Sequence, residues 1–274
     1  MNTYQKLSSL PDELFRRKTG IKRKTFERMV EILKEAESEK KKFGGKPNKL
    51  SMEERLLMWL EYMREYRTYF HTGASWGISE SACFRNCVWI EDILIKQKEF
   101  SLPKRTAPLK SENAIEVVVV DATESPIERP PKKQRKYYSG KKKRHTIKTQ
   151  VLINVKNLKI LKTNFSNGKK HDFRLFKESK PLVLKDTLVQ GDTGYQGIQK
   201  IHQNSNIPYK RKRKTKLSKE EKRYNHTLSS KRIFVEHVIG RLKRFKVISE
   251  RYRNRRRRFG LRFNLIAGIY NSEL

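Results

Sequence analysis

A chain of 274 residues is long enough for one large domain or two small ones, with a hydrophobic core that needs no disulfides. Its 65 Lys and Arg against 29 Asp and Glu give a formal net charge of +36, which argues against an enzyme of neutral small molecules and indicates a polyanionic partner. Because 35% of its residues are hydrophobic, it is too apolar for a disordered basic tail, and we predict a folded nucleic-acid-binding protein.

A membrane surface is the rival polyanion, but the longest apolar runs are only strand-sized and fall short of the roughly 18 residues that a membrane span needs. The first 20 residues also lack the apolar middle of a signal peptide. We therefore expect a soluble, cytoplasmic, nucleoid-associated protein with no membrane partner. Cys83 and Cys87 lie four residues apart on a predicted helix, and no second pair completes a zinc site, so we predict buried reduced thiols.

The amino-terminal third is predicted to be helical. Apolar spacing indicates a helix over residues 24–42, and Ser51 with Glu54 forms a capping box ahead of a strongly apolar helix. A further helix is capped by Ser79, after a short connection that contains glycine, which is typical of a helix-turn-helix. An ordinary helical hairpin is the alternative. If the segment is a helix-turn-helix, the beginning of the helix capped by Ser79 faces DNA. The residues there are Ser79, Glu80, Ser81, Phe84 and Arg85.

Residues 96–110 contain two prolines and read as a linker, so we place a boundary near residue 105 between a helical DNA-binding domain, 1–105, and a second domain, 106–274. The segment IEVVVVDATES, 115–125, then predicts a strand buried on both faces that ends at Asp121. A carboxylate at the end of a central strand lies where open α/β sheets place their chemistry. The alternative is that Asp121 only starts a turn.

The remaining pattern predicts an α/β domain. A proline-rich and then lysine-rich loop precedes a hairpin over 145–155 and 158–166, followed by a helix from His171, a strand ending at Asp192 and a brief strand over 207–209. A long helix capped by Ser229 or Ser230 and a final helix close the chain. In the basic loop, cations beside tyrosines suit a nucleic-acid strand, although a solvated loop is the alternative; the DNA-binding candidates are Lys141, Lys142, Lys143, Arg144 and His145.

Three carboxylates are candidates for a metal site. If the strands that end at Asp121 and Asp192 are neighbours, both side chains meet at one edge, and the long helix can add Glu236. An all-oxygen site prefers Mg²⁺ or Mn²⁺, and two ions about 3.5 to 4 Å apart suit phosphoryl transfer. Arg232 and Lys243 lie on the same predicted helix face as Glu236 and could hold phosphates. A solvated polar stripe is the alternative.

Several segments carry a resemblance to a known family. VVVVDATES, GDTGYQG and RIFVEHVIGRLKRFK resemble the DDE motifs of bacterial insertion-sequence transposases, and the insertion sequence five family is the most similar group. The order of elements is similar to the ribonuclease H-like fold, a mixed sheet flanked by helices. The resemblance implies that Asp121, Asp192 and Glu236 are catalytic metal ligands. One departure is that Ser229 stands where related families begin their last signature with tyrosine.

The resemblance implies a transposase that uses divalent ions, Mg²⁺ or Mn²⁺, to cut transposon ends and to join the resulting 3′-hydroxyl to target DNA. Its amino-terminal helices would bind the terminal inverted repeats of double-stranded DNA. Because two ends must be brought together, we expect a homodimer on DNA. The alternatives are a metal-dependent nuclease that cuts without joining and a DNA-binding regulator in which the carboxylates are structural.

Overall fold

The computed structural model describes residues 3–103, 115–181, 183–211 and 216–274. Two compact units form the chain: a helical unit of Met1–Ser101 with Leu242–Glu273, and a sheet unit of Leu102–Arg241. The boundary predicted near residue 105 lies outside the described residues. The carboxyl-terminal residues, which we had grouped with the second domain, pack with the amino-terminal helices. No helix in the described ranges combines the length and apolar character that a membrane crossing requires.

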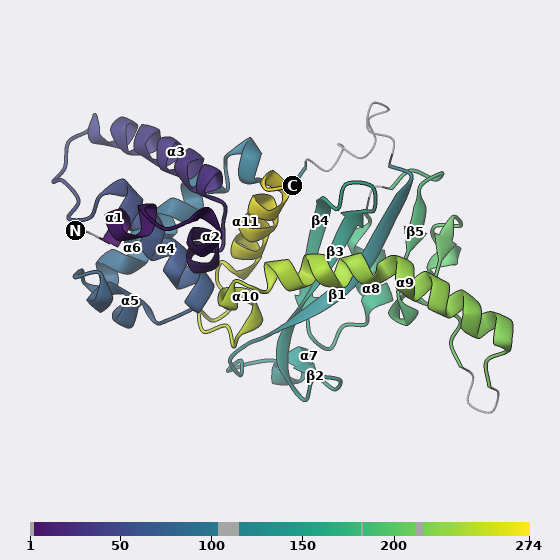
Figure 1. Cartoon of the computed structure of the whole chain (residues 1–274). Helices are drawn as coiled ribbons and strands as arrows, with labels where there is room; N and C mark the ends of the chain where they lie inside the picture. Colours follow the sequence, from purple (N-terminus) through teal and green to yellow (C-terminus); the bar gives the residue numbers. More distant parts are fainter. Residues whose placement is uncertain (1–2, 104–114, 182, 212–215) are drawn as a thin grey trace. The chain divides into compact units, whose positions relative to one another are not determined.

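The helical unit is built around two apolar helices, α4 and α11 (Figure 1). Its buried side chains include Phe15, Trp59 and Phe263. A Cβ on Gly268 of α11 would lie 1.9 Å from the Phe100 carbonyl oxygen, so only glycine allows this approach. The helices are α1 (Thr3–Ser8), α2 (Asp12–Thr19), α3 (Arg23–Lys41), α4 (Met52–Glu65), α5 (Tyr69–Ser75), α6 (Glu80–Leu94), η1 (Lys98–Phe100), α10 (Lys246–Ser249) and α11 (Phe259–Ser272).

The predicted caps of α4 and α6 are confirmed. The Ser51 hydroxyl accepts a hydrogen bond from the backbone amide of Glu54. In return, the Glu54 carboxylate accepts one from the backbone amide of Ser51, and the two bonds form the capping box of α4. The Ser79 hydroxyl accepts from the Ala82 amide at the start of α6. These contacts satisfy amides that have no partner inside the helix.

A short helix, α5, lies where we predicted a turn between α4 and α6. The chain leaves α4 at Tyr66, which has a left-handed φ of 52°, and Thr68 then caps α5. In the turn, the Ile78 amide donates to the Gly73 carbonyl at 3.0 Å. A Cβ on Gly73 would lie 2.8 Å from the Ile78 carbonyl oxygen, so this tight turn needs glycine.

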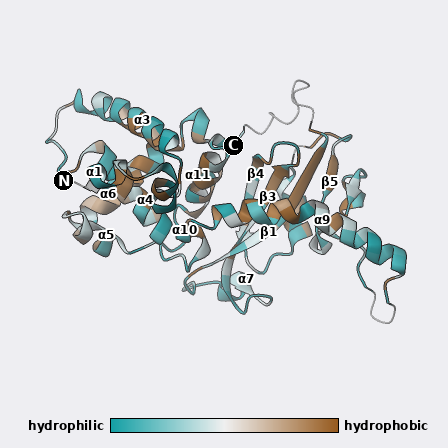
Figure 2. Cartoon of the chain, viewed as in Figure 1, coloured by the Kyte–Doolittle hydropathy of each residue, from teal (hydrophilic) through white to brown (hydrophobic). Residues whose placement is uncertain are grey.

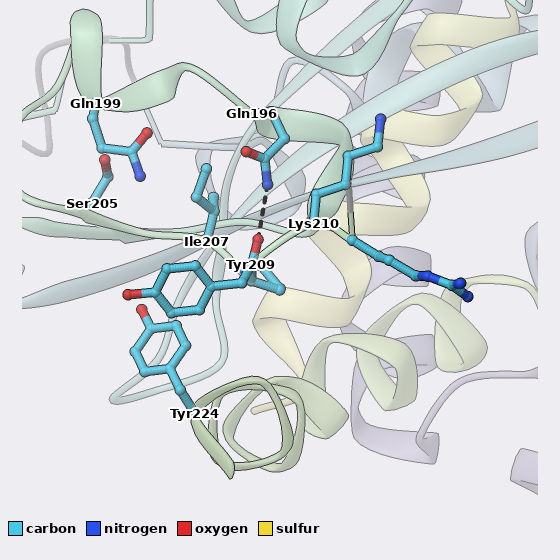
Figure 3. A pocket seen from close by; sticks show the side chains of 9 residues that line it. Gln196, Gln199, Ser205, Ile207, Tyr209, Lys210 and Tyr224 are labelled. Atoms are coloured by element: carbon cyan, nitrogen blue, oxygen red, sulfur yellow. Dashed lines mark hydrogen bonds between the residues drawn. The ribbon is translucent and has the colours of Figure 1, made fainter. Parts of the chain in front are cut away.

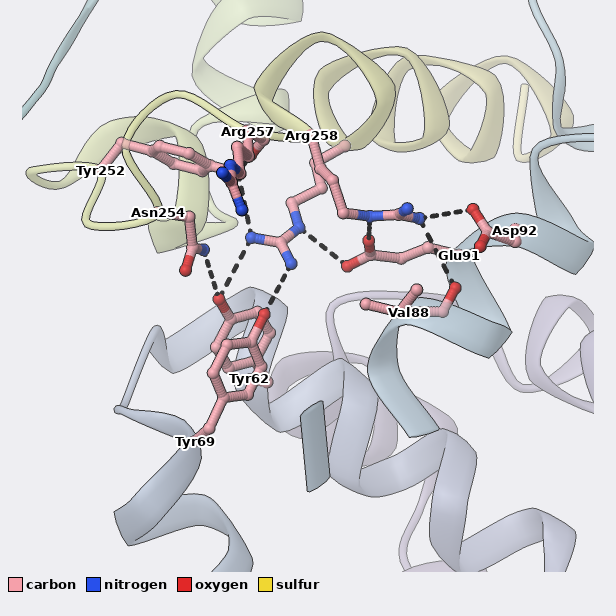
Figure 4. A network of polar contacts seen from close by, with 10 residues as sticks. Tyr62, Tyr69, Val88, Glu91, Asp92, Tyr252, Asn254, Arg257 and Arg258 are labelled. Carbon is pink, nitrogen blue, oxygen red and sulfur yellow. Dashed lines mark hydrogen bonds and ion pairs between the residues drawn. The ribbon is translucent and has the colours of Figure 1, made fainter. Parts of the chain in front are cut away.

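A buried polar network around Arg262 joins α11 to α4, α5 and α6 (Figure 4). The Arg262 guanidinium is 1% exposed, and its Nε donates to Glu91 Oε1 at 2.8 Å. Its remaining nitrogens donate to the hydroxyls of Tyr62, Tyr252 and Tyr69. Each of the three guanidinium nitrogens therefore donates to an acceptor. A charged side chain can be buried only when it is hydrogen-bonded and paired in this way.

The sheet unit contains a mixed sheet in the order β4-β3-β1-β5-β6. The first three of these strands are antiparallel neighbours, and β5 and β6 run parallel to β1. This is the arrangement of the ribonuclease H-like fold, as predicted. The strands are β1 (Val117–Pro126), β2 (Tyr138–Ser139), β3 (Arg144–Asn154), β4 (Ile160–Asn167), β5 (Leu188–Gln190) and β6 (Ser205–Asn206).

Helices cover this sheet, whose central strands are strongly hydrophobic (Figure 2). On one face Val118, Val120 and Leu152 pack with Phe176 of α8 (Asp172–Ser179). The long helix α9 (Lys219–Leu242) lies across the sheet (Figure 1). Two short 3-10 helices, η4 (Thr193–Tyr195) and η5 (Ile198–Lys200), follow β5.

Three local predictions for the sheet unit were wrong. First, α9 begins at Lys219, well before the start that a cap at Ser229 or Ser230 would give, because Ser218 and Glu221 form a reciprocal capping box there. Ser230 instead donates to the His226 carbonyl inside the helix. Second, Ile233 is 56% exposed rather than inward. Third, the last strand is β6, just before the predicted residues 207–209.

Candidate active site and nucleic-acid interface

Asp121 lies within β1 rather than at its end. The antiparallel pairing with β3 continues to Pro126, whereas the parallel pairing with β5 stops at Val119 and Gln190. Asp121 therefore lies just past the end of the pairing with β5, but still inside the pairing with β3. The predicted position at the end of a strand is correct relative to β5 only. Its Oδ1 accepts a hydrogen bond from the Ala122 amide at 2.9 Å, and its side chain is 20% exposed.

Asp192 follows β5 and caps η4, where its Oδ1 accepts from the Gly194 amide at 2.8 Å. Gly194 also admits a third carboxylate. A Cβ on this residue would lie 2.7 Å from Asp172 Oδ2 and 2.9 Å from Asp192 Oδ1. Glycine therefore leaves room for Asp172 and Asp192 to approach from either side of this turn.

Our sequence reasoning missed Asp172. It is the first residue of α8, and its Oδ1 lies 2.7 Å from Lys148 Nζ. Lys148 itself is only 9% exposed in its side chain and also donates to the Lys170 carbonyl. In the sequence this aspartate stands at the start of a predicted helix, where acidic residues are common because they stabilise the helix terminus, so its position gave no sign of a role in the site.

The electrostatics of Asp121 follow from this crowding. Burial raises the pKa of Asp121 to about 6 from its ordinary 3.8, and the negative charges of Asp192 and Asp172 add to the rise. The Ala122 amide and the Arg232 guanidinium lower it. Beside these acids, burial also raises the pKa of Tyr195 well above its usual value, and its hydroxyl lies 3.4 Å from Gln150 Oε1. The site is thus short of positive charge.

The long helix brings Arg232 to the site but not Glu236. Arg232 Nη2 lies 3.9 Å from Asp121 Oδ1, and its Nε is buried with no hydrogen-bond partner among the described residues. Glu236, one turn later on α9, is exposed. Within the described ranges, no three His, Cys, Asp or Glu side chains are grouped closely enough to hold a metal ion. The structure therefore brings together Asp121, Asp192 and Arg232, and leaves Glu236 apart.

The candidate DNA-contacting residues of α6 lie at its exposed beginning. Ser81 and Arg85 are exposed, and the ring of Phe84 is 46% exposed and packs edge-on against Tyr69 at 5.3 Å between centroids. Ser79 is also exposed, but its hydroxyl is already used as the cap. The buried neighbours Cys83 and Cys87 are free thiols, as predicted.

The basic loop connects β2 with β3. Lys141, Lys142, Lys143 and Arg144 are exposed, and His145 is half-buried against the ring of Tyr138 at 5.6 Å. This hairpin presents cations beside an aromatic ring, as the sequence indicated. Lys243 lies just beyond the end of α9, is half-buried and belongs to the helical unit.

Comparison with known proteins decides the family. Residues 120–271 match the family described as DDE superfamily endonuclease. The chain belongs to this family. Residues 48–98 match the helix-turn-helix of DDE superfamily endonucleases. The chain is also 50% identical, over 98% of both chains, to a probable transposase for insertion sequence element IS702 from Microchaete diplosiphon. No solved structure matches it significantly.

DDE endonucleases generally depend on divalent metal ions, and the described acids fit such an ion in part. Asp121 and Asp192 offer carboxylate oxygens, the donors that hard cations prefer, and their mutual repulsion leaves negative charge to be neutralised. A positive ion would also reverse the rise in the pKa of Asp121. Glu236 would have to move toward these residues to join them.

Proposed function

We propose that this chain is a transposase of the insertion sequence five family. The pair of Asp121 and Asp192, with Arg232 beside it, carries the proposal. The 50% identical relative, itself named a probable transposase, and the net charge of +36 support it. Under this proposal the substrate is double-stranded DNA at the two ends of an insertion element.

Asp121, Asp192 and Glu236 would hold Mg²⁺ or Mn²⁺, with two ions at the complete site. Such ions supply a nucleophilic oxygen at neutral pH and neutralise charge on the attacking and leaving oxygens of phosphoryl transfer. Arg232 would donate its unpaired Nε–H to a phosphate oxygen next to Asp121. Water then cleaves the phosphodiester at the transposon end and frees a 3′-hydroxyl, which displaces a 3′-oxygen of target DNA in turn.

The helix-turn-helix and the basic hairpin would contact different parts of the DNA. Ser81, Phe84 and Arg85 at the beginning of α6 would read base edges of the terminal inverted repeats, and Ser79 would hold the end of that helix. The cations of residues 141–145 and Lys243 would hold phosphates, which position DNA without reading its sequence. A homodimer would bring the two ends together.

The test is cleavage of a labelled duplex that carries the element's own end, with Mg²⁺, Mn²⁺, Ca²⁺ or EDTA. Asp121→Asn, Asp192→Asn and Glu236→Gln should each abolish metal-dependent cleavage and retain DNA binding. Glu220→Gln is the matched control, because Glu220 is an exposed acid on the same helix, and it should cleave like the wild type.

Two further measurements separate the alternatives. Pre-cut ends with free 3′-hydroxyls should become covalently joined to target DNA; cleavage without joining would leave a metal-dependent nuclease. Tight binding without cleavage under any metal would instead favour a DNA-binding regulator. Sedimentation of the protein with one and two DNA ends measures whether a dimer forms.

A further inference from the structure

A second candidate binding site lies in the sheet unit. A pocket of about 670 Å³ opens beside β6, lined by residues of the η4–η5 region, the chain that follows β6, and α9 (Figure 3). Its volume falls in the range of about 300–1,000 Å³ that is typical of small-ligand sites. The described lining residues are Gln196, Gln199, Ser205, Ile207, Pro208, Tyr209, Lys210, Arg211 and Tyr224, and none of them is one of the site carboxylates.

Two exposed tyrosines form the wall of this pocket. The rings of Tyr209 and Tyr224 lie 5.2 Å apart between centroids at 62°, and they are 52% and 36% exposed. Asn225 on α9 accepts a hydrogen bond from the Tyr209 amide at 2.8 Å and donates one to the Tyr209 carbonyl at 3.0 Å, and Tyr224 is the residue before it on the same helix. This two-point contact holds both rings on one rigid support, so their exposed faces are available for stacking.

The other walls offer an apolar surface and hydrogen-bonding groups. Ile207 is a buried apolar residue of the pocket wall, and the amide of Gln196 is fixed by donating to the Pro208 carbonyl at 2.8 Å. Gln199 and Ser205 lie side by side at one end of the pocket (Figure 3). Amide and hydroxyl groups at this end can pair with the polar edge of a planar ring.

The opposite end carries positive charge. In Figure 3 the side chain of Lys210 extends on the side away from Gln199 and Ser205, and Arg211, the next residue, also lines the pocket. Both residues are exposed. The pocket therefore presents two aromatic rings, with the Gln199 amide and the Ser205 hydroxyl at one end and the Lys210 ammonium on the opposite side.

We propose that this pocket binds one unstacked nucleotide of a DNA strand. A base would stack on Tyr209 and Tyr224, its edge would face Gln199 and Ser205, and its phosphate would lie beside Lys210 and Arg211. In a paired duplex both base faces are covered by neighbouring bases, so only an extruded or unpaired nucleotide can offer a free face to a tyrosine. The proposal rests on the proposed function in one respect, namely that DNA is the polyanion bound.

The test compares two fluorescently labelled duplexes of the same sequence, one fully paired and one with a single unpaired thymidine. Binding of the full chain is measured by anisotropy in EDTA, so that cleavage plays no part. The wild type should bind the duplex with the unpaired base more tightly. Tyr209→Ala should weaken that complex by roughly 5- to 140-fold, because base–aromatic stacking contributes about 1–3 kcal/mol, and should leave the paired duplex unchanged.

Matched variants control for folding and for general charge. Tyr209→Phe keeps the ring and should keep the preference. Phe43→Ala removes a ring that is 94% exposed on the helical unit and has no assigned role in DNA binding, and it should change neither complex. Lys210→Gln should weaken binding with a shallower salt dependence. Addition of dTMP at the protein concentration should not displace the DNA; displacement would assign the pocket to free nucleotides and overturn the proposal.

Equal binding of the two duplexes by the wild type, or an equal loss on both in Tyr209→Ala, would also overturn it. The outcome is independent of catalysis. If the duplex with the unpaired base is preferred through Tyr209 while no metal supports cleavage, the pocket stands and the transposase proposal fails. If cleavage depends on Asp121 but Tyr209→Ala retains the preference, the reverse holds.

Discussion

Replacing Asp121 by asparagine should stabilise the metal-free sheet unit above pH 6, although it should remove catalysis. In the folded chain the pKa of Asp121 is about 6 rather than 3.8, so the folded state binds this proton more tightly than the unfolded chain. The resulting stabilisation is complete below pH 3.8 and is lost as the pH rises to about 6. Above that pH the folded state must hold an ionised carboxylate that burial and two neighbouring acids disfavour.

The size of the effect follows from the pKa. A rise from 3.8 to about 6 corresponds to about 3 kcal/mol, at about 1.4 kcal/mol for each tenfold change in proton affinity. Asparagine is neutral at every pH and escapes this penalty. The pKa of about 6 already contains the attraction of Arg232 at 3.9 Å, so we expect a stabilisation of up to about 3 kcal/mol above pH 6, and almost none near pH 4.

The assay is urea unfolding in EDTA at both pH values, followed by hydrogen exchange of β1 and β3 amides, which reports on the sheet unit. All three tryptophans, Trp59, Trp76 and Trp89, lie in the helical unit, so their fluorescence is an internal control that should not change. Mg²⁺ should stabilise the wild type and not the variant. A variant that is no more stable than the wild type above pH 6 would refute the reasoning.

Three further predictions concern the cleavage pH profile, the buried network and the recognition helix. At subsaturating Mg²⁺, cleavage should fall as the pH drops below about 6, because protonation of Asp121 competes with metal binding, and Arg232→Gln should move this limb of the pH–rate profile to higher pH. Saturating Mg²⁺ should move the limb to lower pH. Arg262→Met should destabilise the helical unit by roughly 1–3 kcal/mol in tryptophan-monitored urea unfolding, because Glu91 Oε1 loses its buried donor and the carboxylate keeps only Arg258; adding Glu91→Leu should recover much of the loss. Ser79→Ala should cost about 1 kcal/mol in the same assay and weaken DNA binding, and Ser79→Asp should restore stability.

The sequence by itself determined the elements whose signals are local. A run of four valines predicted the central strand, and Ser51 with Glu54 predicted the beginning of α4, because strand burial and helix capping depend on residues a few positions apart. The same reasoning failed for α9, where two candidate serines were available at 229 and 230 and the capping box formed farther upstream, at Ser218.

Only the tertiary structure decided which acids meet. Asp121 and Asp192 come together because β1 and β5 are parallel neighbours, whereas Asp172 reaches them through α8 and the glycine at 194. The packing of α11 with the amino-terminal helices likewise depends on Arg262, whose acceptors lie on helices distant in sequence. Such contacts arise from strand order and helix packing, which join residues far apart in the chain, and no short sequence pattern encodes them.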